Sequence, residues 1–332
     1  MKKYSVIVPV YNRIDEVRDL LESLTHQTVK NFETIIVEDG STLPCRETVE
    51  SFTGELDVKY FYKENEGRSI ARNYGIERSE GNYLIFFDSD CVIPPDYFEI
   101  LDRELSAHPL DCFGGPDAAH DSFTPTQKAI SFAMTSFLTT GGIRGGKVQM
   151  EKFVPRSFNM GYSREVYNAV GGFREMFSED IDMSTRIRQY GFSIGLIHPA
   201  KVYHKRRIDF RKFWRQVHVF GMSRITLKLL YPDSLKLVHT LPAIAVILGI
   251  TLVILGIFVS PWFLLPIGVY FLALFISAWI STRSLGIALR ALPAAVVQIC
   301  GYGCGFIRAY FTKIILGRGR DLGQEIAMRK GK

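Results

Sequence analysis

The sequence predicts an α/β protein in which a doubly wound, mostly parallel sheet is followed by membrane helices. Over the first 110 residues, short apolar, β-branched runs alternate with segments whose apolar residues recur at helical spacing. This alternation is typical of a parallel sheet whose two faces are covered by helices. Farther along, Leu241 to Ile280 contains no charged side chain, and this length suffices for two helices across a bilayer.

Four strands are expected in the first part of the chain, and three of them end in polar turns. The strands are Ser5–Pro9, Phe32–Glu38, Val58–Tyr62 and Tyr83–Phe87, with helices at Asp15–Leu24 and Ser69–Arg78. The polar turns are Asn12-Arg13, Asp39-Gly40 and Asp88-Ser89-Asp90. In doubly wound sheets, ligands bind beyond the carboxyl ends of the strands. These turns are therefore the candidate active site.

The middle of the chain is less regular. Phe153–Tyr162 has the composition of a strand, and a glycine-rich loop at Thr139–Lys147 precedes it. A helix is expected from Ser178 to about Tyr190, with Ser178 as its capping residue. Phe210–Leu230 combines Lys and Arg with Phe and Trp at helical spacing. This pattern predicts an amphipathic helix in the headgroup layer of a membrane.

Two apolar segments are long enough to cross a membrane, and a third is ambiguous. Leu241–Val259 and Trp262–Ile280 each supply nineteen uncharged residues, about 28 Å of helix at ~1.5 Å per residue. Arg308 and Lys313 interrupt the third segment, 291–316, which is re-entrant, interfacial or spanning. Basic residues around the two clean segments and in the tail at 317–332 favour two crossings, with both ends of the chain in the cytoplasm.

Charge and cysteine content indicate in which cellular compartment the soluble part lies and which class of partner the chain binds. The net charge is +6, and between Lys201 and Lys236 ten Lys and Arg accompany only two acids. Beside an apolar block, such a cluster suits anionic lipid headgroups, so no nucleic-acid partner is expected. The five cysteines lack zinc-binding spacing, and the N-terminal apolar run is too short for a signal peptide. We therefore expect the soluble part to face a reducing cytoplasm.

Asp88-Ser89-Asp90 is the sharpest chemical signal. Along an extended backbone, alternate side chains point the same way, so both carboxylates could hold one divalent cation. Mg²⁺ and Mn²⁺ prefer carboxylates and substrate phosphates, and a metal on a diphosphate neutralises a leaving group. The alternative is a solvated loop after a strand. Asn65-Glu66-Gly67 followed by Arg72 adds a glycine turn and a guanidinium suited to phosphate.

These motifs together resemble those of family 2 glycosyltransferases of the GT-A fold. The resemblance runs in the family's order over residues 4–204. It rests on Val6–Asn12, Glu38–Ser41, Asn65–Gly75, Gly81–Asp90, Asn159-Met160, Gly171–Phe173, Glu179–Asp182 with Arg186, Gly191 and His204. Glu38 departs from the pattern, because the family often has Asp before Asp39.

The resemblance implies an inverting sugar transfer from a nucleotide diphosphate, with a UDP-sugar as the favoured donor and Mg²⁺ or Mn²⁺ as cofactor. It assigns the metal to Asp90 and His204. Asp180, at the start of a helix that favours negative charge, matches the base that deprotonates the acceptor. The residues assigned to the donor nucleotide are Pro9, Tyr11, Asn12, Asp39, Arg72 and Asp88. Contacts with the acceptor or diphosphate are expected from Glu179, Asn159, Gln216, Arg224 and Arg144.

The resemblance also suggests the acceptor. Polymer-making members carry Q-x-x-R-W near the first membrane helix, whereas this chain has Gln216 and then Gly221-x-x-Arg224, as in single-transfer enzymes. We expect a polyprenyl-diphosphate-linked saccharide as acceptor, in cell-surface polysaccharide or glycoconjugate assembly. The alternatives are a polyprenyl-phosphate glycosyltransferase and a non-catalytic nucleotide-binding membrane scaffold.

The expected organisation has four parts. A catalytic domain at 1–207 precedes an interfacial region at 208–237, a membrane region at 238–316 and a basic tail at 317–332. The protein is expected to be a multi-pass protein of the inner membrane, with its catalytic domain on the cytoplasmic face.

Overall fold

The computed structural model describes residues 3–118, 123–140, 153–204 and 209–319, which divide into two compact units. Within these ranges the first unit comprises 3–118 and 153–204, and the second comprises 123–140 and 209–319. The first unit is close to the expected catalytic domain. The difference is that 123–140 belongs with the C-terminal helices, because Ala129 and Phe132 are buried against them.

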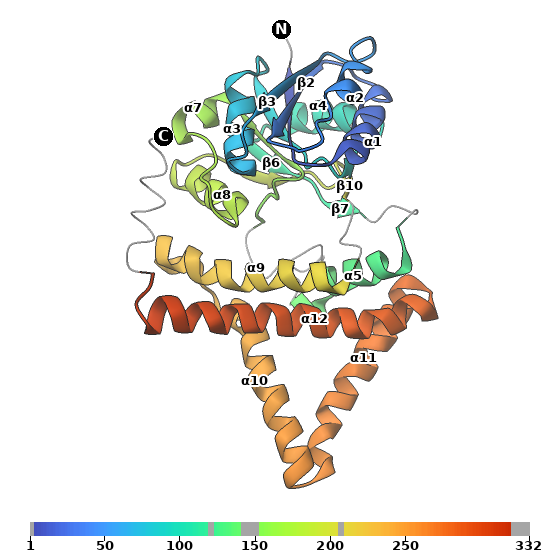
Figure 1. Cartoon of the computed structure of the whole chain (residues 1–332), viewed down its shortest axis with the longest axis vertical. Helices are drawn as coiled ribbons and strands as arrows, with labels where there is room; N and C mark the ends of the chain where they lie inside the picture. Colours follow the sequence, from blue (N-terminus) through green and yellow to red (C-terminus); the bar gives the residue numbers. More distant parts are fainter. Residues whose placement is uncertain (1–2, 119–122, 141–152, 205–208, 320–332) are drawn as a thin grey trace. The chain divides into compact units, whose positions relative to one another are not determined.

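A seven-stranded sheet forms the centre of the first unit (Figure 1). Its strand order is β3-β2-β1-β4-β8-β6-β9. The strands are β1 (Tyr4–Val10), β2 (Phe32–Asp39), β3 (Val58–Lys63), β4 (Tyr83–Phe86), β6 (Cys112–Gly114), β8 (Met160–Ser163) and β9 (Ile194–Leu196). β1 is parallel to β2 and β4, whereas β8 is antiparallel to both of its neighbours. The four expected strands are confirmed, and the sheet is mostly parallel.

The strand expected at Phe153–Tyr162 is mostly wrong. β8 begins only at Met160, and before it Arg156 and Asn159 form an isolated bridge that closes a turn. Pro155 has no backbone N–H to donate to a ladder, which is consistent with irregular chain at this point.

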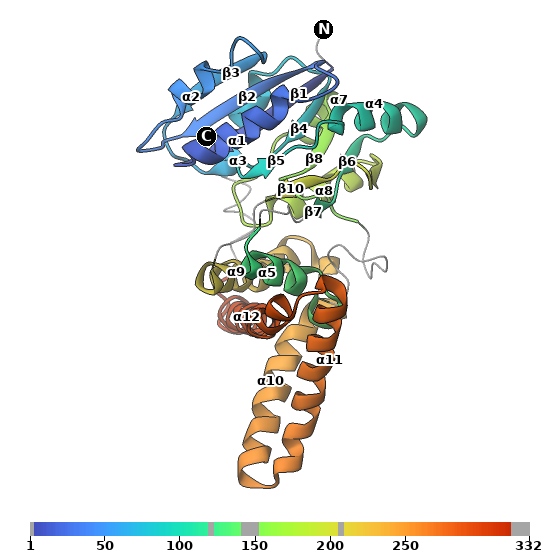
Figure 2. The same ribbon diagram turned by 90° about the vertical axis from the view of Figure 1, so that its right-hand side faces the viewer.

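Helices cover both faces of the sheet (Figure 2). On one face α1 (Ile14–Thr25), α2 (Arg46–Glu50) and α4 (Tyr97–Ala107) pack against Val6 and Val8 of β1. On the other face α3 (Arg68–Glu77), α7 (Arg164–Val170) and α8 (Glu179–Gln189) pack against Ile7. Successive side chains of a strand point to opposite faces, so the nearly continuous apolar sequence of β1 supplies both cores.

A second, three-stranded sheet brings distant residues together. It consists of β5 (Cys91–Val92), β10 (Val202–His204) and β7 (Asp117–Ala118), in the order β5-β10-β7. β10 runs antiparallel to β5, with His204 directly opposite Cys91. These strands are only two or three residues long, too short for a pattern in the sequence to reveal them.

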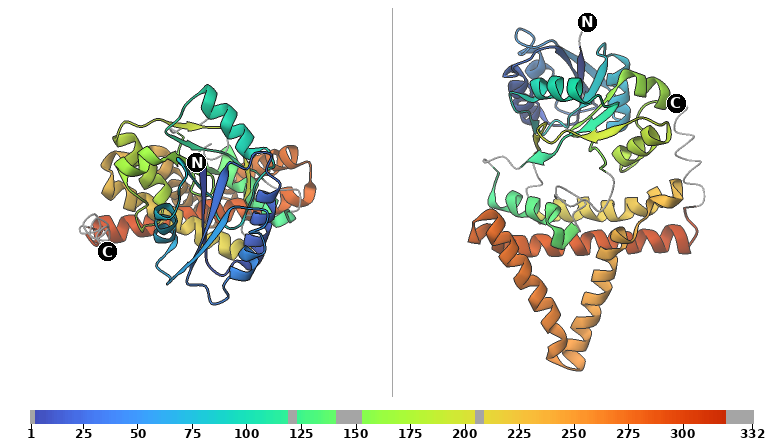
Figure 3. Two further views of the ribbon diagram at one scale, coloured as in Figure 1. Left: turned by 90° about the horizontal axis from the view of Figure 1, so that it is seen from above. Right: turned by 180° about the vertical axis from the view of Figure 1, so that it is seen from behind.

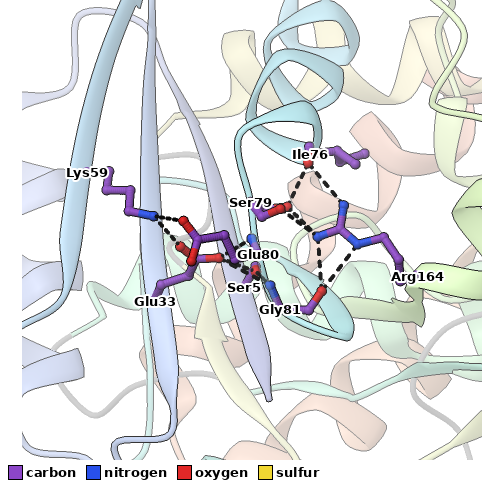
Figure 4. A network of polar contacts seen from close by, with 8 residues as sticks. All are labelled: Ser5, Glu33, Lys59, Ile76, Ser79, Glu80, Gly81 and Arg164. Carbon is purple, nitrogen blue, oxygen red and sulfur yellow. Dashed lines mark hydrogen bonds and ion pairs between the residues drawn. The ribbon is translucent and has the colours of Figure 1, made fainter. Parts of the chain in front are cut away.

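A polar network ties the amino ends of β1, β2 and β3 to the turn before β4 (Figure 4). The Glu33 carboxylate accepts hydrogen bonds from Ser5 Oγ at 2.6 Å, from the Glu80 amide at 2.5 Å and from Lys59 Nζ at 2.9 Å. Burial by itself would raise the pKa of Glu33, but these donors outweigh it, so the pKa is lowered.

Arg164 completes this network from the start of α7. Its guanidinium donates to the carbonyl oxygens of Ile76, Ser79 and Gly81 at 2.9–3.2 Å. These carbonyls belong to the end of α3 and the turn after it, where intrahelical partners run out. The network therefore joins α3, β4 and α7 at the amino ends of the central strands, whereas the candidate site lies at their carboxyl ends.

The second unit is helical. Its α-helices are α5 (Pro125–Thr135), α6 (Phe137–Thr140), α9 (Phe210–Leu230), α10 (Leu237–Phe258), α11 (Leu265–Thr282) and α12 (Leu285–Ala309), with 3₁₀ turns η1 (Pro232–Ser234) and η2 (Pro261–Leu264) and a π-helical turn η3 (Tyr310–Ile315). The helix expected at Phe210–Leu230 is confirmed with those bounds. Views from the front and from behind agree that α9 and α12 lie side by side (Figures 1 and 3).

Glycines allow this close approach of α9 and α12. A Cβ at Gly221 would overlap the backbone of α12 at Tyr302 and Phe306, and a Cβ at Gly305 would overlap the backbone of α9 at His218. Only glycine permits helix backbones to come this near. α5 packs against the same pair of helices, burying Ile130 with Phe213 and Ala294.

Within the part of the chain that the structure describes, three helical segments are long and apolar enough to cross a membrane: Leu237–Phe258, Pro261–Thr282 and Leu285–Ile315. The second contains the segment predicted at Trp262–Ile280, and the first covers the segment predicted at Leu241–Val259 except for its last residue. They differ from the third in packing, because 33% of the apolar window of the third is buried inside the protein, against 11% for each of the others.

Glu33→Gln should lower the free energy of unfolding by about 1–3 kcal/mol at neutral pH, because a buried charged acceptor is lost. The lowered pKa means that this contribution is fully present above the unfolded-state pKa of about 4.3. It is lost as the pH falls through the lower folded-state pKa. Thermal unfolding of both proteins, from neutral pH downward, should show the difference shrinking in acid.

Glu80→Gln is the matched control for this measurement. Glu80 pairs with the same Lys59 Nζ at 2.9 Å, but its side chain is 72% exposed, so the expected loss is at most about 1 kcal/mol. A difference between Glu33→Gln and the wild type that stays constant with pH would contradict the lowered pKa.

Candidate active site

A cavity of about 430 Å³ opens at the carboxyl ends of β1 and β2. Its walls come from the end of β1, the loop between β3 and α3, and the loop before α8. The lining residues are Pro9, Val10, Tyr11, Asp39, Asn65, Gly67, Arg68, Glu175, Met176 and Phe177. Aromatic rings, carboxylates and a guanidinium together suit a ligand with a flat ring and charged groups. Three of the predicted donor residues, Pro9, Tyr11 and Asp39, line this cavity.

Asp39 organises one wall of the cavity. Its Oδ1 accepts hydrogen bonds from Lys63 Nζ and from the Glu66 amide, each at 3.0 Å, and its Oδ2 accepts from the Gly67 amide at 2.9 Å. Gly67 has a φ of 102°, which favours glycine, and a Cβ there would lie 2.7 Å from Glu175 Oε1. Asp39 therefore builds the turn at 64–67, and its contact with a base stays a prediction.

Asn12 and Glu38 hold the loop after β2. Asn12 has a left-handed φ of 53°, and its Oδ1 accepts from the Thr42 amide at 2.9 Å. The buried Glu38 carboxylate accepts from the Ser41 hydroxyl and, at 2.7 Å, from the Cys45 amide. Neither residue lines the cavity, and neither does the loop at 41–45 that they hold. At this departure from the family pattern, the Glu38 carboxylate therefore serves the loop.

Arg72 is fully buried and links two acids. Its Nη2 donates to Asp88 Oδ1 at 2.7 Å, and its Nη1 donates to Glu179 Oε1 at 2.9 Å. Asp88 follows β4, whereas Glu179 begins α8. The sequence associated Arg72 with the nucleotide, but the cavity lining does not include it. The structure makes it the connection between the turn after β4 and the start of α8.

Arg68 is one of the cavity residues that the sequence did not single out. It lies one helical turn before Arg72 on α3, with 48% of its side chain exposed, and its Nη2 pairs with Glu179 Oε2 at 2.8 Å. Its guanidinium also lies 5.4 Å from the centre of the Phe177 ring. The available signal was spacing, because residues four apart on a helix share a face.

Glu175 was also missed. It lines the cavity beside Gly67. Burial, together with the negative charge of Glu179, raises the pKa of Glu175. Its position follows from the path of the loop before α8, which no local sequence pattern encodes.

Asp88, Asp90 and His204 meet after β4. His204 Nε2 lies 3.1 Å from Asp90 Oδ1 and 4.0 Å from Asp88 Oδ2, and the imidazole stacks on Phe158 with ring centres 4.4 Å apart. Each carboxylate thus has an oxygen within 4.0 Å of His204 Nε2, but not for the reason that the sequence suggested. The backbone is a turn, in which the Cys91 amide donates to the Asp88 carbonyl at 3.1 Å, and not an extended strand.

Cys91 lies beside this group. Among the described residues, Asp90, Cys91 and His204 present potential metal-ligand atoms that all lie within 4.8 Å of one another. The thiol is buried and donates a weak hydrogen bond to the Phe158 carbonyl at 3.6 Å. Burial raises the pKa of Cys91 well above its ordinary value, so the thiol is protonated in the metal-free protein.

The acids of the first turn of α8 have three different environments. Glu179 is 2% exposed, within the network of Arg72 and Arg68. Asp182 is fully buried between Arg174 at 3.0 Å and Arg186 at 2.9 Å. Asp180 keeps 14% of its side chain exposed, and its Oδ2 lies 3.3 Å from Arg156 Nη1. Asp180 is thus the member of this acidic turn with the most access to solvent.

The expected capping of α8 by Ser178 is wrong. The helix begins at Glu179, one residue after the predicted start, and Ser178 has a left-handed backbone, with φ 67° and ψ 39°, and a side chain that makes no capping hydrogen bond. The Oδ1 of Asp180 instead accepts from the Ile181 amide at 2.8 Å. A capping serine requires an extended backbone, which the turn at this position does not have.

The residues expected to contact the acceptor or diphosphate are distributed over both units. Asn159 is fully buried, accepting from Tyr97 Oη at 2.6 Å and donating to the Ala200 carbonyl at 2.8 Å. Gln216 and Arg224 lie on α9 in the second unit. Arg144 lies outside the described residues. The contacts of these residues with an acceptor stay predictions.

Comparison with known families decides the class of this protein. A family model described as Glycosyl transferase family 2 matches residues 5–171, half of the chain. The chain belongs to this family. The match includes the cavity residues of β1, β2 and α3 and the acids Asp88 and Asp90. It ends before Asp180 and His204, whose significance in this chain rests on their geometry.

Curated relatives are also glycosyltransferases. Glycosyltransferase AglE of Haloferax volcanii is 26% identical over 255 residues, which cover 70% of this chain and 78% of that protein. Glycosyltransferase GlyA of Streptococcus pneumoniae is 42% identical over 111 residues, which cover 33% of this chain and 16% of GlyA. An uncharacterized glycosyltransferase of Rickettsia felis is 45% identical over 98 residues, which cover 30% of this chain and 16% of that protein. The chain thus spans only 16% of the length of these last two relatives.

A solved structure has the same fold. Mannosyltransferase PcManGT from Pyrobaculum calidifontis superposes with a TM-score of 0.53 at 15% sequence identity, covering 90% of this chain and 87% of that chain. At this identity the likeness concerns the fold alone, and the expected GT-A fold is confirmed.

Proposed function

We propose that this protein is an inverting, metal-dependent glycosyltransferase that moves a sugar from a nucleotide diphosphate to a lipid-linked saccharide. One observation carries the proposal. In the first unit, a cavity and a carboxylate–histidine group both lie near the carboxyl ends of β1, β2 and β4. Arg72 joins this group to the acidic start of α8. Binding, charge neutralisation and proton removal, the three tasks of such a transfer, each have candidate residues there.

The cavity suits the donor. Tyr11 and Phe177 offer aromatic faces for a base, and Arg68 offers a cation for a phosphate. PcManGT, which shares the fold, has been solved in complex with GDP-Man and Mn²⁺. We keep a UDP-sugar as the favoured donor on the basis of the sequence, and GDP-sugars are the natural comparison.

A divalent cation fits between Asp90 and His204, with Asp88 beside them. Carboxylate oxygens and an imidazole nitrogen are ligands that Mn²⁺ and, for the oxygens, Mg²⁺ accept. One oxygen of Asp88 pairs with Arg72, while the other lies 4.0 Å from His204. A cation at this position would neutralise charge on the leaving diphosphate.

Asp180 is the proposed base. In this role it takes the proton of the acceptor hydroxyl while the hydroxyl oxygen bonds to the anomeric carbon. The bond to the diphosphate breaks on the opposite face, so the configuration at that carbon is inverted. The neighbouring Glu179 is buried in ion pairs with Arg68 and Arg72, which leaves it poorly placed to meet an acceptor.

The second unit supports a lipid-linked acceptor. Its exposed apolar helices would hold the enzyme at a membrane, where an acceptor anchored by a polyprenyl chain diffuses in two dimensions. α9 carries Gln216 and Arg224, which suit hydrogen bonding and charge pairing with a diphosphate.

Two membrane crossings fit the helices better than three. α12 is packed against α9 through Gly221 and Gly305, and α9 carries Arg211, Lys212 and Arg215, charges that are costly in hydrocarbon. Because α12 packs along α9, the two helices lie at the same depth relative to the membrane. We therefore propose that α10 and α11 cross the membrane and that α12 lies along its cytoplasmic surface.

A transfer assay tests the function. The purified full-length protein, in lipid nanodiscs with polyprenyl-diphosphate saccharide, should release nucleotide from one UDP- or GDP-sugar of a panel when Mn²⁺ or Mg²⁺ is present. Chelator or Asp90→Asn should reduce the rate by about 10²–10³-fold, because a metal contributes several kcal/mol of charge stabilisation. Asp96→Asn, at an exposed acid nearby in sequence, is the control.

Other outcomes of this assay select the alternatives. Nucleotide-sugar binding without release on any acceptor would indicate a scaffold. Transfer to polyprenyl phosphate alone would indicate a polyprenyl-phosphate glycosyltransferase. Full activity in excess chelator would refute the metal assignment.

Asp180→Asn tests the base. The variant keeps the size of the side chain but loses most of its basicity, so turnover should fall by about 10²–10⁴-fold. The dissociation constant of the donor should change little. Glu179→Gln should lose less turnover but more thermal stability, because Arg72 and Arg68 lose a charged partner. If Asp180→Asn retains turnover while Glu179→Gln is inactive, the assignment of the base is wrong.

Reporter fusions test the topology. A reporter after Lys332 should be cytoplasmic, and a reporter inserted at Ser260, between α10 and η2, should be extracytoplasmic. The second fusion is the positive control for the hairpin. An extracytoplasmic signal after Lys332 would mean that α12 crosses the membrane, and the number of spans would then be three.

A further inference from the structure

We propose that Cys91 forms, with Asp90 and His204, a site for thiophilic divalent ions such as Zn²⁺, and that these ions block the centre which Mn²⁺ or Mg²⁺ activates. The location of the activating ion rests on the proposed function. The existence of a thiol-containing metal site rests on the geometry of β5 and β10 and can be tested without a sugar donor.

Strand register creates the site. β10 runs antiparallel to β5 with His204 directly opposite Cys91, and side chains of directly opposed residues lie on the same face of a sheet. Asp90 immediately precedes Cys91. As a result, one oxygen, one sulfur and one nitrogen lie within 4.8 Å of one another, and the oxygen–nitrogen separation is 3.1 Å.

This donor set discriminates between metals. Hard ions such as Mg²⁺ and Mn²⁺ use carboxylate and phosphate oxygens and do not need the thiol, whereas thiolate ligands favour Zn²⁺ and other softer ions. Asp, Cys and His are each zinc ligands, and three protein ligands leave one position of a tetrahedral zinc ion open. The three ligand atoms would have to move closer to reach bonding distance from one ion. Their side chains belong to Asp90 in a turn and to Cys91 and His204 at strand ends.

Binding involves one proton and no electrons. The metal–sulfur bond forms as the S–H bond of Cys91 breaks, and the proton passes to solvent. The bound metal keeps its oxidation state.

Coordination geometry supplies the reason for inhibition. An octahedral ion held by Asp90 and His204 would keep several positions open for diphosphate oxygens and water. A tetrahedral ion that also binds Cys91 would keep only one. Such an ion would offer the diphosphate fewer positions, and Zn²⁺ generally binds nitrogen and oxygen donors more tightly than Mn²⁺ does.

Cys300 and Cys304 are the rival soft-metal ligands. They lie four residues apart on α12, half-buried in the second unit, and are thus one helical turn from each other. The variant Cys300→Ser/Cys304→Ser removes this pair and leaves Cys91 intact. Cys112→Ser replaces another fully buried cysteine and serves as the matched control for loss of a buried thiol.

Co²⁺ titration of the full-length protein in detergent is the decisive experiment, because thiolate ligation gives a near-ultraviolet charge-transfer band. We expect the band in the wild type, in Cys112→Ser and in Cys300→Ser/Cys304→Ser, and we expect it to be absent in Cys91→Ser and Cys91→Ala. A band of unchanged intensity in both Cys91 variants, or one lost only with Cys300 and Cys304, would overturn the proposal.

X-ray absorption at zinc keeps the test independent of the Cys91 variants. Zn²⁺ bound to the Cys300→Ser/Cys304→Ser protein should show one sulfur neighbour at about 2.3 Å. A coordination shell of nitrogen and oxygen alone would exclude Cys91 as a ligand even if its substitutions impair folding.

The activity arm links the site to regulation. Zn²⁺ should inhibit transfer in competition with Mn²⁺. Its inhibition constant should rise at least tenfold in Cys91→Ser, since even an outer-shell partner of a ligand is worth about 10–100-fold in metal affinity. A cysteine-dependent Co²⁺ band without Mn²⁺-dependent transfer would refute the proposed function and leave this site standing. The reverse result would refute the site alone.

Discussion

The ion pairs of the buried Arg72 are the constraint on which the candidate site depends. One guanidinium holds Asp88 after β4 and Glu179 at the start of α8, so the proposed metal-binding turn and the helix of the proposed base share one anchor. Losing one partner of a buried ion pair typically costs about 3–5 kcal/mol. Asp88 and Glu179 therefore both depend on Arg72. Because Asp180 directly follows Glu179, its position depends on the same ion pair. The left-handed Ser178 shows how sharply the chain turns to bring Glu179 to Arg72.

Acidic side chains at the strand ends build the site before they bind anything. Glu38 and Asp39 are adjacent on β2, so they point to opposite faces. Glu38 holds the loop at 41–45, whereas Asp39 holds the turn at 64–67. In the turn at 64–67, Gly67 lacks a Cβ, which would otherwise collide with the Glu175 carboxylate. The cavity wall is thus organised by hydrogen bonds that exist without a ligand, which limits the ordering that a donor would have to induce.

The helical unit follows a different principle. The buried residues of α9 include Gly221, whereas its Lys and Arg residues make the helix basic. Glycine replaces side-chain interdigitation with backbone contact, so α12 lies unusually close to a basic helix. α10 and α11 instead expose apolar side chains along most of their length. Length and hydropathy alone do not distinguish these two kinds of helix, and the packing around Gly305 does.

The sequence by itself determined the β-α alternation, the four strands of the first ninety residues, α9 with its bounds, and the two uncharged apolar segments, because each depends on local periodicity and composition. The resemblance to the family also indicated Pro9, Tyr11 and Asp39, which lie at or just beyond the carboxyl ends of β1 and β2. Only the tertiary structure decided that Arg72 is a buried link, that Arg68 and Glu175 line the cavity, and that Cys91 faces His204 across two short strands. These placements depend on loop paths and on pairing between segments more than one hundred residues apart, and hydrophobic periodicity carries no information about either.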